Sequence, residues 1–414
     1  MNETFLSLFG TEALTRCRYA FARAKELCGE PTPFPGGFAR LTCRHEETGA
    51  IVPVYLDHLL ASTEAVTPIL SVLMPHGEWR PLVATYGDDV LLFFDAAQFI
   101  EDLTQERYLP PARPMSDLLP FHYHRLPAAL RRQVHRGLVR WRRRRFHEVE
   151  QGAWPHWDIQ SLWRILFAAL GLPYPDGSPE KIFVFSHDVD NAAQLAFAER
   201  LARWEVDHGV RACFFLPAVV MRREASRVQA LSDMGHEIGM HGLRHDNRQT
   251  RIAPQDYATE MRTYWNELQR FKVRGYRGPS LLSSSSLKKA LFTLFAYDSS
   301  IPDTDVYGEG GKHRGCGFGR PFIVEKMRVL PVTLPLDDRL FTLGESDYFG
   351  IWRAKSNWLL ARNDVPVLCT HACAEYYPHG FERVFTPLLK YVLEEAKAKI
   401  VLPQAAAEIN ASNG

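Results

Sequence analysis

Residues 235–245 read GHEIGMHGLRH, and they place two histidines, His241 and His245, four positions apart directly after a short apolar run. If the chain turns helical here, both imidazoles point to one side with Cβ atoms about 5–6 Å apart, close enough to share one metal ion. An HxxxH pair alone is weak evidence, because unrelated helices also contain it. Its meaning depends on the side chains that follow the neighbouring strands.

A second segment, FSHDVD at 185–190, ends an apolar run with Asp188 and Asp190. Residues two apart at the end of a strand project to the same face, so the two carboxylates suit a metal ligand beside a general base. Together with the histidine pair they predict a facial set of two histidines and one carboxylate with open positions for water. The alternative is an Asx turn in which Asp190 helps to cap the next helix. His187 points to the opposite face and is expected to be structural.

From about residue 178, short apolar runs alternate with longer amphipathic stretches, which predicts a parallel sheet with helices outside. Residues suited to chemistry follow strand after strand: Asp188, His241, Arg277, Asp298 and His371. Reactive groups gathered at the carboxyl ends of parallel strands are typical of a (β/α) barrel. We therefore expect a (β/α) barrel over 178–405, followed by a flexible tail at 406–414.

Residues 178–402 resemble the polysaccharide deacetylase (NodB homology) family, also called carbohydrate esterase family 4. FSHDVD resembles its first motif, and GHEIGMHGLRH closely resembles its GHEIGNHTxxH segment. ACFFLP resembles the strand before that segment, while YRGPS and LCTH resemble the R-x-P-Y and L-x-x-H motifs. The resemblance implies an α/β fold with a distorted (β/α) barrel. It also implies a metal-dependent hydrolase acting on carbon–nitrogen amide bonds.

In this family pattern Asp190, His241 and His245 would bind a divalent ion, which we expect to be zinc, and Asp188 would be the catalytic base. The HDVD spacing differs from two adjacent acids, so Asp188 and Asp190 could exchange these roles. We favour Asp190 as the ligand because it lies further beyond the strand end, where the ion should sit.

The other roles that the resemblance implies concern proton transfer and the oxyanion. His371 would be the catalytic acid, Arg277 would hold the base, and Asp298 would orient Arg277. The backbone N–H of Ser280, which follows the proline, would bind the oxyanion. Ser280 stands where the family usually has tyrosine, which favours a small glycan or nucleotide-linked sugar over a long polymer.

Several further residues are candidates for the site. Cys369 and Cys373 flank His371, but we predict buried free cysteines, since alternate strand residues should face away from the site. The glycine-rich stretch 308–319 is expected to be a loop at the site mouth, where His313 or Arg314 would touch substrate. His236 is expected to be structural or to contact a metal-ligating residue rather than the ion itself.

Residues 1–125 mix an amphipathic start with short apolar runs and predict an α/β accessory domain without a chemical motif. Residues 126–177 form an Arg-rich helical linker, with eight arginines in Arg131–Arg145. Such a run would contact a phosphate or an anionic membrane surface, and its alternative is a solvated helix face. Nucleic acid is not expected, because a basic run without a recognition fold is weak evidence for it.

Composition narrows the compartment and the function. The 49 Lys and Arg residues balance 48 Asp and Glu, so no global charge favours a polyanionic partner. An odd count of 7 cysteines without a CxxC, no signal-like N-terminus and no transmembrane segment favour a cytoplasmic protein. Together with the activity that the family resemblance implies, these features predict a deacetylase of an N-acetylated sugar in a cytoplasmic glycan or nucleotide-sugar precursor for surface polysaccharide. The alternatives are hydrolysis of another non-peptide amide, or a non-catalytic module that binds glycan or nucleic acid.

Overall fold

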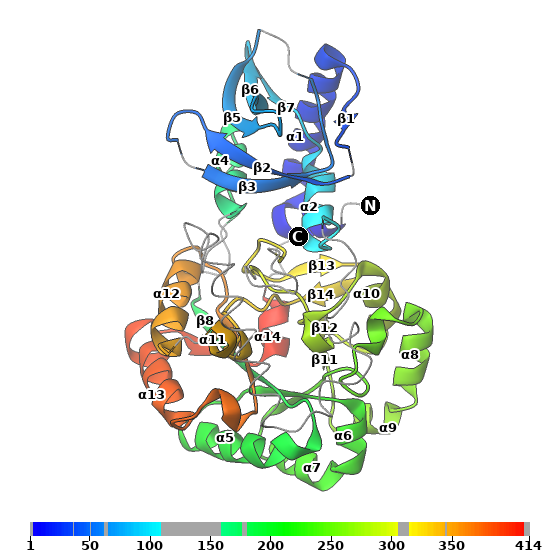
Figure 1. Cartoon of the computed structure of the whole chain (residues 1–414), viewed down its shortest axis with the longest axis vertical. Helices are drawn as coiled ribbons and strands as arrows, with labels where there is room; N and C mark the ends of the chain where they lie inside the picture. Colours follow the sequence, from blue (N-terminus) through cyan, green and yellow to red (C-terminus); the bar gives the residue numbers. More distant parts are fainter. Residues whose placement is uncertain are drawn as a thin grey trace.

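The computed structural model describes residues 3–35, 37–49, 51–61, 65–108, 159–175, 180–304, 314–343 and 346–409. Two bodies share these residues, as Figure 1 shows: a smaller one built around the N-terminal elements and a larger one with helices around a sheet. Among the described helices, none combines the length and apolar character required to cross a bilayer. The arginines of Arg131–Arg145, and with them the expected phosphate or membrane contact, lie outside the described residues.

The N-terminal body combines helices with an antiparallel sheet of order β3-β2-β5-β6-β7. Its helices and strands are α1 (Glu3–Cys28), β1 (Thr32–Pro33), β2 (Ala39–His45), β3 (Ile51–Leu56), β4 (His58–Leu59), β5 (Thr67–Leu73), β6 (Trp79–Tyr86), β7 (Asp89–Leu92), α2 (Ala96–Thr104) and α4 (Ile159–Ala169). The side chain of Asp95 caps α2 by accepting hydrogen bonds from the N–H groups of Ala97 and Gln98. A hydrophobic core between α1, α2 and the sheet then buries the apolar face of each element.

Helix α4 belongs to this body, although the sequence placed it in a linker. Its Trp163, Leu166 and Phe167 are at most 2% exposed and pack with Phe9 of α1. The large apolar face of α4 explains this placement, because an exposed linker helix would leave that face in water. The rest of the expected linker, residues 126–158, lies outside the described residues.

The larger body is built on a sheet that follows the predicted β/α alternation. Its strands are β8 (Ile182–Asp188), β9 (Cys213–Leu216), β10 (Glu237–Met240), β11 (Gly275–Tyr276), β12 (Tyr297–Asp298), β13 (Phe322–Val324), β14 (Met327–Val329), β15 (Val367–His371) and β16 (Lys399–Ile400). They run in the order β13-β14-β12-β11-β10-β9-β8-β15, with β16 also paired to β8, and all pairs are parallel except β13 with β14. This is the mixed α/β architecture of a distorted (β/α) barrel.

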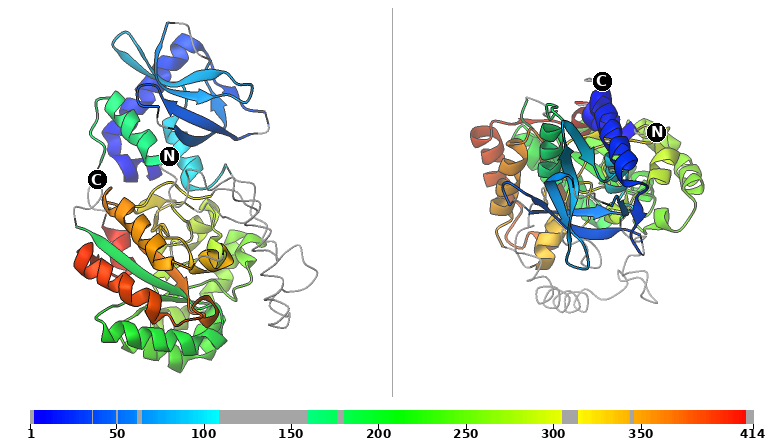
Figure 2. Two further views of the ribbon diagram at one scale, coloured as in Figure 1. Left: turned by 60° about the vertical axis from the view of Figure 1, so that its left-hand side comes forward. Right: turned by 90° about the horizontal axis from the view of Figure 1, so that it is seen from above.

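The helices of this body surround the sheet, except the last one (Figures 1 and 2). They are α5 (Leu195–Asp207), α6 (Ala218–Arg223), α7 (Ala225–Asp233), α8 (Pro254–Arg262), α9 (Trp265–Arg270), α10 (Ser285–Leu291), α11 (Asp337–Leu343), α12 (Tyr348–Leu360), α13 (Glu382–Lys390) and α14 (Pro403–Glu408). Helix α14 packs its buried Ala406 and Ala407 against Ile182 and Val184 of β8. Residues 406–408 are therefore part of the barrel, because they fill its interior, and the expected tail does not begin at 406.

A segment between β14 and β15 brings the two ends of the curled sheet together. Val332 pairs with Pro302 beyond β12, while the N–H groups of Thr333 and Leu334 donate to the carbonyl of Val367 in β15. These bonds link the β12 side to the β15 side and curve the sheet around α14. The two bodies also share one core, since Phe318 and Phe322 of the barrel pack into the N-terminal cluster.

Candidate active site

Strand β8 sends alternate side chains to two different environments. Ser186 and Asp188 face the barrel interior, while His187 faces the outer helices, as the strand periodicity predicts. His187 is fully buried, and its nitrogens bind Thr370 Oγ1 at 2.7 Å and Glu205 Oε1 at 2.8 Å. The expectation that His187 is structural is thus confirmed by its contacts.

Asp190, His241 and His245 meet just beyond the ends of β8 and β10. Asp190 Oδ1 lies 3.6 Å from His241 Nε2 and 3.2 Å from His245 Nε2. This oxygen is buried and has no hydrogen-bond partner within the described part of the chain. The three potential ligand atoms lie within 4.8 Å of one another. A buried carboxylate oxygen facing two imidazole nitrogens without a hydrogen bond fits a shared divalent ion.

The two imidazoles present their Nε2 atoms to Asp190. His241 Nδ1 lies 3.0 Å from the carbonyl oxygen of Arg277, which can only accept, so Nδ1 carries a hydrogen and Nε2 is the nitrogen that faces the carboxylate. Burial lowers the pKa of His245 to about 4, and the facing Asp190 only partly opposes this shift, so the ring is neutral at pH 7. The donor set of this structure therefore fits a divalent cation.

The loop between the two histidines is not the helix that the HxxxH spacing suggested. Strand β10 ends at Met240, and both Gly242, with φ of 69°, and His245, with φ of 55°, are left-handed. A Cβ on Gly242 would lie 2.8 Å from the ring of Pro279, so this turn accepts only glycine without movement. A tight turn against Pro279, rather than helical periodicity, brings the two rings to a centroid separation of 5.0 Å.

Asp188 is held beside these groups by Arg277. Arg277 Nη1 donates to Asp188 Oδ1 at 2.9 Å, and Nη2 donates to Ser186 Oγ and Ser299 Oγ at 3.0 Å each. Burial alone would raise the pKa of Asp188, but the opposing positive charges, of which the Arg277 guanidinium contributes most, together hold this pKa below its usual value. Asp188 is therefore an anion that keeps Oδ2 toward the cluster, 3.8 Å from His241 Nε2.

Asp298 does not orient Arg277, contrary to the expectation from the family pattern. Its carboxylate lies 3.0 Å from Lys288 Nζ and also accepts hydrogen bonds from Ser283 and Ser300. Ser299, the next residue, contacts Arg277 instead, through both its hydroxyl and its carbonyl oxygen. Because β12 has only two residues, a shift of one position at its end decides whether Asp298 or Ser299 contacts Arg277.

His371 reaches the site from β15, where it pairs in register with Asp188. Its ring Nδ1 lies 2.7 Å from Asp337 Oδ1, and its backbone N–H donates to Asp337 Oδ2. Burial would lower the pKa of His371, but the Asp337 carboxylate outweighs it and raises this pKa well above its usual value. Burial raises the pKa of Asp337, yet Asp338 N–H and Tyr377 O–H also donate to it, so the shared proton lies on His371.

Sequence reasoning missed Asp337 and misjudged Cys369. The adjacent acids in LPLDDRLF, at the start of α11, were the available signal for Asp337. Cys369 lies two residues before His371 and so shares its face, with Sγ 3.2 Å from Arg277 Nη1 and 3.4 Å from Asp188 Oδ2. Cys369 is a buried free cysteine as predicted, but it faces the site rather than away from it.

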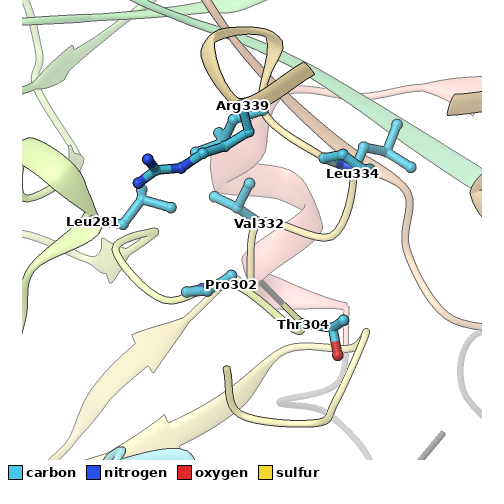
Figure 3. A pocket seen from close by; sticks show the side chains of 8 residues that line it. Leu281, Pro302, Thr304, Val332, Leu334 and Arg339 are labelled. Carbon is cyan, nitrogen blue, oxygen red and sulfur yellow. The ribbon is translucent and has the colours of Figure 1, made fainter. Parts of the chain in front are cut away.

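Ser280 lies in the turn after β11, where the chain passes the site. Its φ of 56° and the φ of 55° at Leu281 are both left-handed. Leu281 also lines a small, mainly apolar pocket beside the site (Figure 3). The other residues around this pocket are Pro302, Thr304, Val332, Leu334, Pro335, Leu336 and Arg339. Among the residues named for the site mouth, Arg314 binds Glu106, while His313 lies outside the described residues.

No family model and no curated protein match the chain. Solved structures are similar to it at low identity. One is a Mycobacterium smegmatis protein assigned provisionally as a polysaccharide deacetylase, with 19% identity, a TM-score of 0.44, and coverage of 57% of this chain and 92% of that one. A family 4 carbohydrate esterase from Streptomyces lividans shows 13% identity, a TM-score of 0.35, and coverage of 53% and 91%. A family 4 pseudoenzyme from Bacillus anthracis shows 14% identity, a TM-score of 0.37, and coverage of 57% and 68%.

Proposed function

We propose that this chain is a metal-dependent deacetylase that removes the N-acetyl group of an amino sugar in a cytoplasmic glycan or nucleotide-sugar precursor. The observation that carries this proposal is the unpaired Asp190 Oδ1 facing two imidazoles, with Asp188 beside His241 and His371 next to Asp188 on the neighbouring strand. A metal site with a carboxylate base and a cationic acid beside it is the minimum that amide hydrolysis requires.

Asp190, His241 and His245 would hold the ion, most simply zinc, which would lower the pKa of a water molecule and polarise the acyl carbonyl. Asp188, fixed by Arg277, would take the proton from the attacking water. The backbone N–H of Ser280 would donate to the oxyanion as the carbon–oxygen bond forms. His371 would protonate the nitrogen as the carbon–nitrogen bond breaks, releasing acetate and the free amine.

Asp190 is the better ligand of the two carboxylates, because only its oxygen lies near both histidines. Asp188 Oδ1 is engaged by Arg277 at 2.9 Å, which orients the carboxylate so that Oδ2 faces the cluster, where it could take a proton from water. The roles that the HDVD spacing left open are thus proposed with Asp188 as base and Asp190 as ligand.

The free thiols and the arginine-rich segment bear on the compartment and the substrate. None of the 7 cysteines, all within the described residues, forms a disulfide, and a reducing compartment such as the cytoplasm keeps thiols in that state. The eight arginines in Arg131–Arg145 would attract a phosphate-bearing precursor. We therefore expect N-acetylated nucleotide-sugars to be better substrates than the corresponding neutral sugars.

The first test is the metal content of the purified protein by elemental analysis. We expect about one zinc or similar ion per chain in the wild type and almost none in the His241→Ala/His245→Ala variant. The exposed His379 supplies a matched control, since His379→Ala should keep the ion. Acetate release from N-acetylated nucleotide-sugars should follow the metal. A wild-type protein that binds no ion after reloading would exclude this mechanism.

A further inference from the structure

Glu106, at the end of the N-terminal body, reaches across to the barrel. Its carboxylate accepts two hydrogen bonds from Arg314, from Nε at 2.8 Å and from Nη2 at 2.7 Å, and a third from the N–H of Gly315 at 3.0 Å. The Arg314 and Glu106 side chains are only 10% and 14% exposed. A bidentate pair of this kind, largely removed from water, fixes the guanidinium in one plane and orientation.

The same guanidinium also contacts the turn that carries Ser280. Arg314 Nη2 donates to the carbonyl oxygen of Leu281 at 3.0 Å, and Nη1 lies 3.5 Å from the carbonyl oxygen of Ser280. The contact therefore runs from Glu106 through Arg314 to the carbonyl groups of Ser280 and Leu281, in the two peptide bonds that follow these residues.

This turn needs external support, because Ser280 and Leu281 are both left-handed. Residues with a Cβ disfavour that conformation, and it persists only where the surroundings hold it. Gln249 holds the preceding residue, since its Nε2 donates to the carbonyl of Pro279 at 3.2 Å. At Ser280 and Leu281 the carbonyl oxygens are held by Arg314.

We propose that Glu106 is a positioning residue for the reaction, and that through Arg314 it holds the turn at Ser280 and Leu281 so that the Ser280 N–H keeps the orientation that binds the oxyanion. This inference rests on the proposed deacetylase function. It gives the N-terminal body a role in turnover: the barrel supplies the reacting groups, and Glu106 of the N-terminal body fixes the turn on which one of them lies.

The first test is Glu106→Gln, which keeps the size of the side chain and removes its charge. We expect kcat for acetate release to fall about tenfold, less than the loss of a whole oxyanion donor, with KM, metal content and the pH profile unchanged. Glu3→Gln is the matched control, because Glu3 also accepts a hydrogen bond across the two bodies, from the N–H of Lys326, away from the turn. Its kcat should equal that of the wild type.

A charge-swap double variant distinguishes positioning of the turn from an ion pair that only links the two bodies. Glu106→Arg combined with Arg314→Glu restores an opposite-charge pair but places a carboxylate against the carbonyls of Ser280 and Leu281. Positioning predicts that kcat stays low in this double variant. Recovery of the wild-type kcat would overturn the inference, because an ion pair that only links the two bodies would work equally well with its charges exchanged.

Hydrogen exchange provides a readout that does not depend on activity. In Glu106→Gln, the backbone amides of residues 280–283 should exchange faster than in the wild type, and in Glu3→Gln they should not. If the wild type releases no acetate from any N-acetylated sugar, the proposed function fails, and this exchange still decides whether Glu106 holds the turn. Equal exchange in Glu106→Gln and in the wild type would overturn the inference.

Discussion

Both faces of β8 carry histidines next to carboxylates, but the two groups differ in which of their polar atoms already have partners. On the interior face, Asp188 lies beside the candidate metal-binding cluster of Asp190, His241 and His245. On the outer face, His187 and His236 approach the carboxylate of Glu205, and all three side chains are fully buried. Strand β15 repeats the division, since His371 joins the interior cluster while Thr370 binds His187.

The difference lies in which lone pairs remain available. His236 has both ring nitrogens engaged, one by the N–H of Ala212 and the other by the carbonyl of Ala202. Glu205 Oε2 has no hydrogen-bond partner among the described residues, but the nitrogens around it are already used. In the interior cluster an unpaired oxygen and two Nε2 atoms converge. Convergence of unused donor atoms, rather than the mere presence of His and Asp, separates a candidate site from a structural cluster.

The largest expected effects come from the two carboxylates of the interior face. Asp188→Asn should lower kcat by about a thousandfold, as expected when a general base is lost, while the ion is retained. Asp190→Asn should lose the ion on dialysis, because the cluster keeps only its two neutral nitrogen ligands. Elemental analysis and acetate release distinguish the two variants. The opposite pattern, with the ion lost in Asp188→Asn and kept in Asp190→Asn, would show that the two residues exchange roles.

On the outer face we expect an effect on stability instead. Glu205→Ala should lower the free energy of unfolding by about 3 kcal/mol, because it leaves His187 Nε2 buried without its partner. Glu199→Ala on the same helix is the control, since its partly exposed ion pair with Arg227 should be worth less than about 1 kcal/mol. Urea denaturation measures both. Loss of metal from folded Glu205→Ala protein would contradict the division between the faces.

The division between the faces could be predicted from the sequence, because it follows from strand periodicity. Once β8 and β15 are recognised, the period of two places Asp188 and His371 together and His187 opposite them. The carboxyl ends of parallel strands then bring His241 and Arg277 to the same edge. These positions depend only on local conformation and on the order of the strands.

The parts that could not be predicted depend on irregular backbone. Asp337 meets His371 because the segment after β14 turns back along β15, and no periodicity encodes that path. Asp298 and Ser299 differ by one position at the end of a two-residue strand, so their directions could not be assigned. His245 reaches Asp190 through a turn at Gly242 whose geometry depends on contact with Pro279.

A smaller effect tests whether His371, on the interior face, is the catalytic acid. If His371 acts as the acid, the rate falls as the pH rises through its pKa, which Asp337 raises well above the usual value despite burial. Asp337→Asn removes the carboxylate that stabilises the imidazolium, so the pKa falls and the alkaline limb of kcat moves to lower pH. At pH 8 we expect kcat to drop about tenfold. An alkaline limb that does not move would show that another group supplies the proton.

The smallest expected effect concerns Cys369, which faces Asp188 but is not one of the proposed metal ligands. Burial raises the pKa of its thiol well above the usual value, so it is a neutral donor to Asp188 rather than a thiolate that could compete for the ion. Cys369→Ser keeps a donor of similar size and should change kcat by less than about threefold, with full metal content. Cys373→Ser, at a half-buried thiol nearby, is the control. Loss of the ion in Cys369→Ser alone would make the sulfur a ligand, and the interior cluster would then have to be assigned again.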